Sequence, residues 1–271
     1  GRNTAPAIAL LCKVLKQRGL KDEIVGVFPA DHYIANKEQF VDQVSLAEKA
    51  ASGKKIVTFG IRPSYQATGY GYIQAEGNNG DTLHVKEFKE KPNKEVASSY
   101  IKSGDYYWNS GIFVWRTTTI LKAIEENDPA LMEHINVICN AYESPEFEEI
   151  FQREFSAIKG RSIDYTVLET HDNVVVIPTA FEWNDVGSWQ SIESLFPVDE
   201  NNNTIISKHV YVKSTNNIVW TSEDHLVATV GIHNCIIVHT ANATLIANKD
   251  DEESVREVVT IIESLGWESF L

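Results

Sequence analysis

The sequence predicts an α/β domain that is followed by a small β-rich domain and a closing helix. In the first part of the chain, apolar residues at helical spacing alternate with short apolar runs. Such alternation is typical of a sheet flanked by helices. From residue 201 to residue 247 the apolar runs become short and alternating, and Asn, Ser and Gly separate them, which is typical of an all-β region. We therefore expect two domains, residues 1–196 and residues 197–271.

Composition narrows the class of protein. A hydrophobic content of 43% and a charged content of 23% are ordinary for a globular chain. The net charge of -14 argues against nucleic acid as a partner, because phosphate backbones need clustered Lys and Arg. No apolar run has the length of a membrane span, so we expect no membrane partner. The three cysteines lie far apart in apolar surroundings, which favours free thiols and a cytoplasmic location.

The elements of the first domain follow from this spacing. A helix is expected to begin near Thr4, which can cap it, with Pro6 in its first turn. The apolar run 24–28 predicts a buried strand, and the rhythm that follows it predicts a parallel sheet. The expected helices are at 37–52, 118–126 and 129–142. The further expected strands are at 55–60, 70–73, 83–88, 112–115 and 174–177, with a turn at 77–80.

The second domain should form a small sheet or a few coils of a β-helix. The acidic run 250–253 then opens the closing helix, which carries Val255, Val258, Val259 and Ile262 on one face. We expect this face to pack on the main domain or on a second subunit, and the protein to be a homodimer. The expected strands are at 209–212, 218–221, 226–230, 235–239 and 244–247.

Two carboxylates are candidates for a metal site. Asp31 follows the strand at 24–28, at the sheet edge where α/β proteins place their ligands, although taken alone a helix-capping role is favoured. Asp185 lies in a second loop, between Trp183 and Trp189. Carboxylates from two loops can share a Mg²⁺ ion whose other ligands come from substrate phosphates. Spacing alone does not decide between these interpretations.

Three further segments have the chemistry of a sugar-phosphate site. Glu90 and Lys91 place an acid that can accept hydrogen bonds from hydroxyls beside a cation for a phosphate, although a charged strand end is common. Gly71 belongs to a Gly-Tyr-Gly segment that lacks the third Gly of a dinucleotide site, so we expect a backbone donor near a ligand or a simple turn. Asn109 follows Trp108. The pair can supply an amide and an aromatic wall to a sugar, or it can simply form a turn with a half-buried Trp.

Seven segments occur in a specific order, and this order is similar to that of a known family. They read GRNTAPAI at 1–8, FPADH at 28–32, TGYGYI at 68–73, FKEKP at 88–92, WNSGIF at 108–113, SIDY at 162–165 and WNDVGSW at 183–189. Over essentially its whole length the chain resembles the bacterial mannose-1-phosphate guanylyltransferases, also called GDP-mannose pyrophosphorylases.

The resemblance implies a Rossmann-like nucleotidyltransferase sheet and a role for each matching residue. Asp31 and Asp185 match the aspartates that hold the catalytic Mg²⁺, so Asp31, Asp185 and Lys91 are the implied catalytic residues. Glu90 matches the acid that bonds mannose hydroxyls, and Lys91 the cation on the sugar phosphate. The remaining matches are Gly71 and Asn109 at sugar-contacting positions, Arg2, Asn3 and Thr4 near the nucleotide, and Asp164 and Glu169 in a motif without an assigned role.

The implied reaction transfers GMP from GTP to mannose 1-phosphate, giving GDP-mannose and pyrophosphate, with Mg²⁺ as cofactor. The alternatives are another sugar-1-phosphate nucleotidylyltransferase and a non-catalytic module that binds sugar nucleotides. The family also has a glycine-rich loop with Arg and Lys that cradles the triphosphate, and no segment here matches it. We therefore expect the first strands of the sheet to precede Gly1, and we expect no turnover from residues 1–271 alone.

Overall fold

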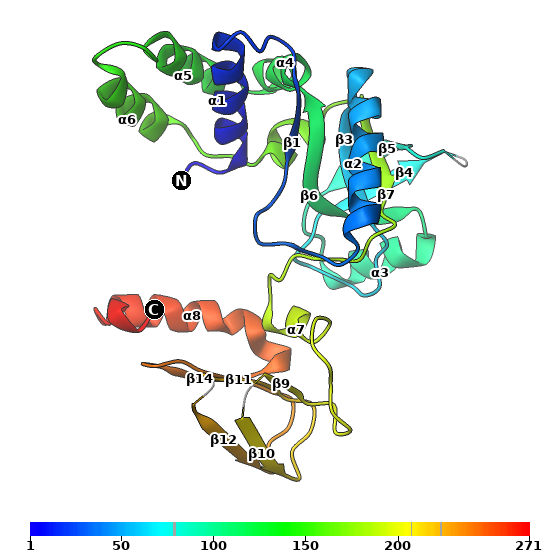
Figure 1. Ribbon diagram of the computed structural model, residues 1–271, viewed down its shortest axis with the longest axis vertical. Helices are drawn as coiled ribbons and strands as arrows, with labels where there is room; N and C mark the ends of the chain where they lie inside the picture. The colour runs from blue at the N-terminus through cyan, green and yellow to red at the C-terminus, as the bar shows by residue number, and fades with distance from the viewer. Residues whose placement is uncertain (78–79, 207, 223) are drawn as a thin grey trace. The chain divides into compact units, whose positions relative to one another are not determined.

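The computed structural model describes residues 1–77, 80–206, 208–222 and 224–271. The chain divides into two compact units, which are labelled by element in Figure 1. The N-terminal unit comprises Gly1–Ala30 and Ile34–Trp183, and the C-terminal unit comprises Asp31–Tyr33 and Asn184–Leu271. The sequence placed the boundary later, after residue 196. The difference arises because Trp189, which follows Asp185, packs on the apolar cluster of the C-terminal unit.

A six-stranded sheet with the order β1-β6-β3-β7-β5-β4 forms the centre of the N-terminal unit. The expected α/β class is confirmed, but among the described residues of this sheet only the β3–β7 neighbours pair in parallel. The long strand β6 lies between β1 and β3 and runs antiparallel to both. The strands are β1 (Ile24–Val27), β3 (Ile56–Ile61), β4 (Tyr72–Glu76), β5 (Leu83–Lys89), β6 (Tyr106–Arg116) and β7 (Val174–Pro178).

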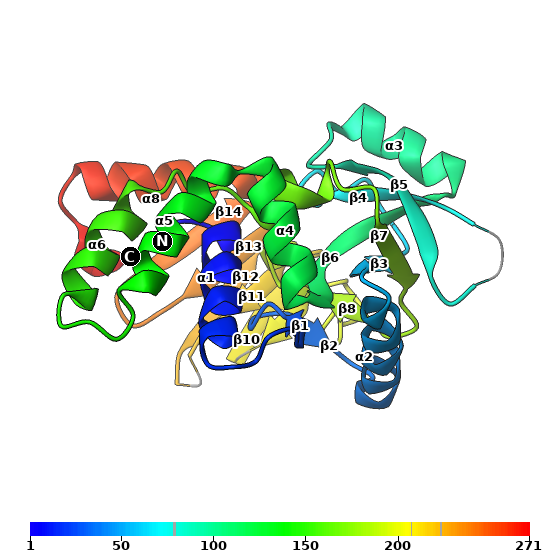
Figure 2. The ribbon, with the colours of Figure 1, turned by 90° about the horizontal axis from the view of Figure 1, so that it is seen from above.

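Helices cover both faces of this sheet because successive side chains of a strand point to opposite sides. Ile56 packs in the larger apolar cluster with α1, α4 and α5, whereas its neighbour Val57 packs in the cluster on the α2 side. Val174 and Val175 divide in the same way. Figure 2 shows α1 and α4 grouped together and α2 standing apart from them. The core of the unit therefore consists of two apolar layers with the sheet between them.

The helices match most of the expected ranges. Asn3 caps the first helix by accepting a hydrogen bond from the Thr4 amide, so the expectation that Thr4 is the cap was one residue late. Of the turn expected at 77–80, residues 78 and 79 lie outside the described residues. The helices of this unit are α1 (Thr4–Gln17), α2 (Lys37–Ser52), α3 (Lys94–Ser103), α4 (Thr117–Asn127), α5 (Pro129–Asn140), α6 (Phe147–Ala157) and one π-helical turn, η1 (Asp164–Leu168).

The C-terminal unit has the expected β-helix-like architecture. Strands β9, β11 and β13 pair in parallel, as do β10 and β12, while β14 closes the first group antiparallel to β13. The strands are β9 (Thr204–Ile206), β10 (Lys208–Val212), β11 (Ile218–Trp220), β12 (Leu226–Val230), β13 (Cys235–His239) and β14 (Thr244–Asn248). Two short strands, β2 (Tyr33–Ile34) and β8 (Trp183–Asn184), lie where the chain passes between the units.

Asparagines define the turns between the coils. Asn216 and Asn234 have positive φ angles of 57° and 56°, a conformation that Asn tolerates better than most residues. Asn216 Nδ2 donates to Asn234 Oδ1 at 2.8 Å, and Asn234 Nδ2 donates to Asn248 Oδ1 at 3.1 Å. These side chains form a ladder that satisfies polar groups from one coil to the next.

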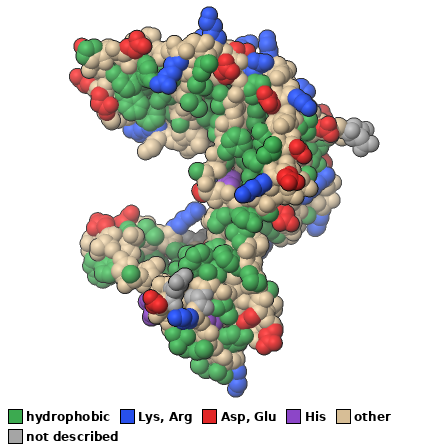
Figure 3. Space-filling model, in the orientation of Figure 1, with side chains coloured by type: hydrophobic (Ala, Val, Ile, Leu, Met, Phe, Trp, Pro, Cys, Tyr) green, Lys and Arg blue, Asp and Glu red, His purple; other side chains and the backbone are tan. Residues whose placement is uncertain are grey.

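The closing helix is confirmed, although its first turns are irregular. The 3₁₀ segment η2 (Lys249–Ser254) leads into α8 (Val255–Ser264), and η3 (Glu268–Phe270) ends the chain. No residue of α8 is buried, and Ile261 is 56% exposed. In the C-terminal unit, hydrophobic side chains also gather on the surface where β10 and β12 lie (Figure 3), and Val230 is 70% exposed there. Among the described residues, no helix is long and apolar enough to cross a membrane.

Candidate functional site

Two groups of predicted site residues exist, one in each unit, and the first is built around Glu90. Glu90 and Lys91 directly follow β5, and the Lys91 amide donates to the Tyr70 carbonyl at 3.2 Å, next to Gly71. A Cβ atom on Gly71 would lie 2.5 Å from Glu90 Oε2, so a side chain at this position would displace the carboxylate. Lys91 Nζ lies 3.6 Å from Glu90 Oε1, and the Lys91 side chain is 61% exposed. The acid is therefore largely buried, while the cation reaches solvent.

Asn109 joins this group through β6. Its amide donates to the Gly71 carbonyl at 2.8 Å, which fixes the backbone beside Glu90. The Asn109 side chain is also held, because its Oδ1 accepts from Thr58 Oγ1 at 3.1 Å and its Nδ2 donates to Asp164 Oδ1 at 2.9 Å. Together these contacts bring Gly71, Glu90, Lys91 and Asn109 to one place, and their role in binding a sugar phosphate stays a prediction.

Asp164 is one of the two residues, with Glu169, that the sequence left without a role. Burial raises the pKa of Asp164, although hydrogen bonds from its own backbone, from Asn109 and from Ser162 oppose the shift. Burial also raises the pKa of Glu90, and the charge of Asp164 raises it further, whereas Lys91 lowers it. Two carboxyl groups thus interact in a region of low dielectric constant. Such a region strengthens hydrogen bonds to sugar hydroxyls and favours a cation nearby.

Aromatic rings line the neighbouring surface. The Tyr70 ring centroid lies 5.1 Å from Trp108 and 5.6 Å from Trp183, with edge-to-face geometry in both pairs. Tyr65 packs edge-to-face on Trp108 at 4.8 Å. Trp108 is buried, so it supports the tyrosines more than it faces solvent. The sequence signalled Trp108 but gave no reason to place Tyr65 and Tyr70 against it.

The residues expected near the nucleotide all make contacts within the N-terminal unit. Arg2 Nη2 donates to the Ser156 carbonyl at the end of α6, and Asn3, with φ of 67°, caps α1. Thr4 Oγ1 accepts from the Ile163 amide at 2.9 Å, and Ile163 directly precedes Asp164. The start of α1 therefore lies beside the turn that carries Asp164. A nucleotide role for Arg2, Asn3 and Thr4 stays a prediction.

The second group lies in the C-terminal unit and contains both aspartates. Burial lowers the pKa of His32, and the charges of Asp31 and Asp185 oppose that shift, so both carboxylates act on the same imidazole. The Gly187 amide donates to Asp185 Oδ1 at 3.1 Å, and a Cβ on Gly187 would lie 2.5 Å from Asp185 Oδ2. His32 was not predicted, although it directly follows Asp31.

The donor chemistry of this group fits a hard divalent cation. Carboxylate oxygens are the ligands that Mg²⁺ prefers, and the ion usually keeps water or substrate phosphate as its remaining ligands. No cluster of three or more His, Cys, Asp and Glu side chains is arranged for a metal in the parts of the chain that the structure describes. Two aspartates alone would therefore leave coordination positions for a phosphate-bearing substrate.

Comparison with known proteins shows the family to which this fold belongs. The sequence model of the Nucleotidyl transferase family matches residues 1–202, and that of the MannoseP isomerase/GMP-like beta-helix domain matches residues 207–261. The chain belongs to the nucleotidyl transferase family.

Two curated relatives are similar to the chain over almost its whole length. The chain is 37% identical over 268 residues to the mannose-1-phosphate guanylyltransferase of Klebsiella pneumoniae, covering 97% of this chain and 56% of that protein. It is 37% identical to the xanthan biosynthesis protein XanB of Xanthomonas campestris, with 98% and 56% covered. The chain thus spans about half the length of the curated relatives it matches.

A solved structure is similar over nearly the whole chain. The crystal structure of mannose-1-phosphate geranyltransferase from Thermus thermophilus superposes with a TM-score of 0.86 at 30% identity. The match covers 97% of this chain and 76% of that one. A mannose-6-phosphate isomerase from Helicobacter pylori matches with a TM-score of 0.59 at 25% identity, over 68% of this chain and 72% of that one. Similarity therefore extends through both units.

Proposed function

We propose that the protein transfers GMP from GTP to mannose 1-phosphate, giving GDP-mannose and pyrophosphate. The observation that carries this proposal is the largely buried Glu90 carboxylate, which lies beside Lys91 and next to Gly71. A largely buried carboxylate accepts hydroxyl hydrogen bonds, and an exposed ammonium next to it can neutralise a phosphate. That combination suits a sugar that carries a phosphate on its first carbon.

Each residue then has a distinct task. Glu90 accepts hydrogen bonds from mannose hydroxyls, and Lys91 pairs with the phosphate of the sugar. The side-chain amide of Asn109 is held by Thr58 and Asp164 and supplies a further contact to the sugar. The backbone at Gly71 supplies another. Arg2, Asn3 and Thr4 are proposed to lie near the nucleotide. In this account the N-terminal unit supplies the sugar contacts.

Asp31 and Asp185 are proposed to bind the divalent metal on which nucleotidyltransferases of this family generally depend, and we propose that this metal is Mg²⁺. A bound Mg²⁺ neutralises phosphate charge and helps to orient the triphosphate. The half-buried Asp185 is held by the Gly187 amide, and its charge and that of Asp31 act together on His32. The chain therefore presents two carboxylates whose combined charge attracts a cation.

The proposed reaction needs no covalent intermediate with the protein. A phosphate oxygen of mannose 1-phosphate forms a bond to the α-phosphorus of GTP. The bond from that phosphorus to the bridging oxygen breaks, and pyrophosphate leaves with the electron pair. Lys91 reduces the repulsion between the two phosphates, and the sugar contacts align the attacking oxygen.

The test is steady-state turnover of the full-length protein. Pyrophosphate release is measured with mannose 1-phosphate and GTP, and separately with glucose 1-phosphate or with other nucleoside triphosphates. We expect the highest kcat/KM for the mannose and guanine pair. A preference for another sugar or base would favour a different sugar-1-phosphate nucleotidylyltransferase. Binding of GDP-mannose without turnover would favour a non-catalytic module.

We also propose a cytoplasmic location and a homodimer. Within the described part of the chain, all three cysteines are free thiols, and Cys12 and Cys139 are buried. Free buried thiols suit a reducing compartment. Fractionation of the source cells and detection of the chain in the cytoplasmic fraction would test the location.

A further inference from the structure

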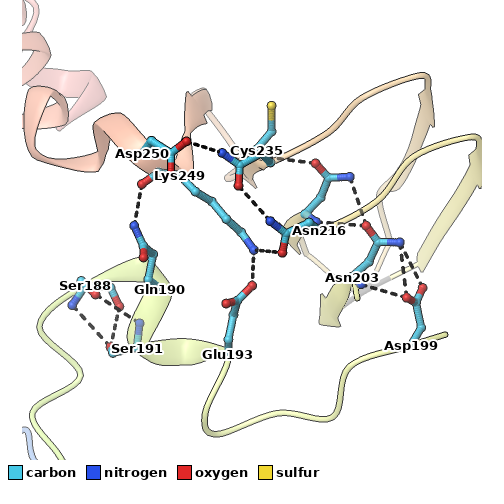
Figure 4. Close-up of polar contacts among 12 residues, drawn as sticks. Ser188, Gln190, Ser191, Glu193, Asp199, Asn203, Asn216, Cys235, Lys249 and Asp250 are labelled. Carbon is cyan, nitrogen blue, oxygen red and sulfur yellow. Dashed lines mark hydrogen bonds and ion pairs between the residues drawn. The ribbon is translucent and has the colours of Figure 1, made fainter. Parts of the chain in front are cut away.

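A buried lysine ties the segment that follows Asp185 to the β-helix-like core of the C-terminal unit. Lys249 is only 5% exposed, which is unusual for a lysine. Its Nζ forms an ion pair with Glu193 Oε1 and donates to Asn216 Oδ1 at 3.2 Å (Figure 4). A buried charge of this kind is retained only with well-placed partners, and removal of one partner leaves the other uncompensated.

Both ends of this contact are anchored. On the core side, the Lys249 amide donates to the Asn234 carbonyl at 2.9 Å, within the asparagine ladder. On the other side, Glu193 directly follows the short helix α7 (Trp189–Ile192), and Gln190 of that helix donates to the Lys249 carbonyl. Figure 4 shows Gln190 and Glu193 reaching Lys249 from the same helical segment. The lysine therefore holds α7 through its main chain and its side chain.

From α7 the connection continues to Asp185. Ser188 caps α7 through a reciprocal pair of hydrogen bonds with Ser191. Asn184 Nδ2 donates to the Ser191 carbonyl at 3.1 Å, and Asn184 Oδ1 accepts from the Val186 amide at 2.7 Å. Asn184 is thus fixed to α7, and Val186, on the other side of Asp185, is fixed to Asn184. Val186 has a positive φ of 51°, so this loop holds a backbone conformation that the surrounding contacts must maintain.

We propose that Lys249 and Glu193 are positioning residues that fix the Asp185 carboxylate for metal binding. This inference rests on the proposed function, because it assumes that Asp185 holds the divalent ion. The distant lysine acts through α7 and Asn184 and does not touch the metal. Partners outside the first coordination sphere commonly change metal affinity by about 10- to 100-fold when they are replaced.

The experiment compares variants of the full-length protein by two readouts. The first is hydrogen exchange of the amides at 183–196 without any ligand, and the second is the Mg²⁺ concentration for half-maximal turnover at saturating substrates. For Lys249→Met and Glu193→Gln we expect faster exchange in this segment and about a tenfold higher Mg²⁺ requirement. Lys249→Arg should retain most of the wild-type behaviour because it keeps the charge. Glu193→Gln removes the same ion pair and supplies the test if Lys249→Met does not fold.

Two controls separate positioning from general stability. Lys208→Met removes a charge from an exposed position of the same unit and should change neither readout. Val219→Ala opens a cavity at a fully buried position of β11 and should lower Tm without raising the Mg²⁺ requirement. A fall in Tm for Lys249→Met with unchanged exchange or an unchanged Mg²⁺ requirement would overturn the inference.

Failure of the proposed function would look different. In that case the wild-type protein would not turn over GTP and mannose 1-phosphate at all. The second readout would then be the affinity for Mn²⁺ alone, measured by electron paramagnetic resonance of the free ion. Weaker Mn²⁺ binding by Lys249→Met than by Lys208→Met would support the positioning role, and equal binding would refute it.

Discussion

At Gly71 the absence of a side chain leaves space for the Glu90 carboxylate. Because a Cβ would approach Glu90 Oε2 to 2.5 Å, Gly71→Ala should push the carboxylate away from the sugar site. We expect a higher KM for mannose 1-phosphate and little change in the KM for GTP. Gly69→Ala is the matched control, because a Cβ at Gly69 has no atom within 4 Å. Equal effects of both variants on the sugar KM would contradict the assignment of Gly71.

Glu90 itself offers a more direct test of the sugar contact. Its side chain is only 13% exposed, and a hydrogen bond to a charged group contributes about 1.5–3 kcal/mol. Glu90→Gln should therefore raise the KM for mannose 1-phosphate roughly tenfold or more, and that for GTP much less. Steady-state kinetics with each substrate varied in turn measures both. A raised GTP KM with an unchanged sugar KM would show that the two substrates are exchanged.

Asp164 should make stability depend on pH. Its folded-state pKa is raised above the ordinary value of 3.8, so the folded protein holds this proton more tightly than the unfolded chain does. The resulting contribution to stability is present below the unfolded pKa. It is lost as the pH rises through that value toward the folded one. Asp164→Asn should therefore raise Tm relative to wild type more at about pH 7 than at about pH 4.

Thermal unfolding at the two pH values checks this prediction. Asp172→Asn is a suitable control, because Asp172 is exposed and lies outside the carboxylate cluster. A Tm difference between Asp164→Asn and wild type that does not grow with pH would mean that Asp164 is not penalised by burial.

Among the elements, the turns of the β-helix-like coils depend on asparagine for two separate reasons. Asn234 has a positive φ and also makes ladder hydrogen bonds to Asn216 and Asn248. Asn234→Gly keeps the backbone conformation and loses the ladder, whereas Asn234→Ala loses both. We expect a loss of about 1 kcal/mol for glycine and a larger one for alanine, measured by denaturant unfolding. If alanine were no worse than glycine, backbone strain would not contribute.

The elements also show what sequence can predict. The helix at 37–52 and the strand at 226–230 were predicted with their observed bounds, because strong periodicity and clear turn residues define them. The helices α3 and α6 were not predicted. In α3 only Ala97 is fully buried, so the part of this helix that faces the core is small. The helix α6 does carry an apolar stripe, because Phe147, Phe151 and Phe155 recur at helical spacing and pack against the core, and this period was a signal that the sequence analysis missed.

The order of the strands in the sheet was harder to predict from the sequence than their positions along the chain. The alternation of helix and strand predicted a parallel sheet, but β6 inserts between β1 and β3 antiparallel to both, and β5 pairs antiparallel with β4 and β7. No local pattern encodes that insertion. In the candidate site, Glu90 and Asn109 could be proposed from the sequence because a carboxylate and an amide can bind sugar hydroxyls. The contact between Asn109 and Asp164 joins residues far apart in sequence and needed the fold.

At the scale of the whole molecule, the expected homodimer stays a prediction. Apolar side chains such as Ile261 are exposed on α8, and Leu265, which directly follows this helix, is exposed too. This apolar surface is a reason to expect that two copies of the chain associate. We expect a dimer in sedimentation velocity at micromolar concentration, and Ile261→Arg should shift it toward monomer. Thr260→Arg, on an exposed polar position of the same helix, should not. A wild-type monomer would contradict the expectation.

We propose that Asp31 and Asp185 of the C-terminal unit bind the metal on which nucleotidyl transfer to the sugar phosphate depends. The most direct measurement is kcat for GDP-mannose formation at saturating Mg²⁺ by the full-length Asp31→Asn and Asp185→Asn variants. Asp224→Asn, an exposed aspartate of the same unit, is the control. We predict that each of the first two variants loses at least about 100-fold in kcat while remaining folded, because charge stabilisation at the phosphates is lost. Near-normal turnover in either of them would contradict the account.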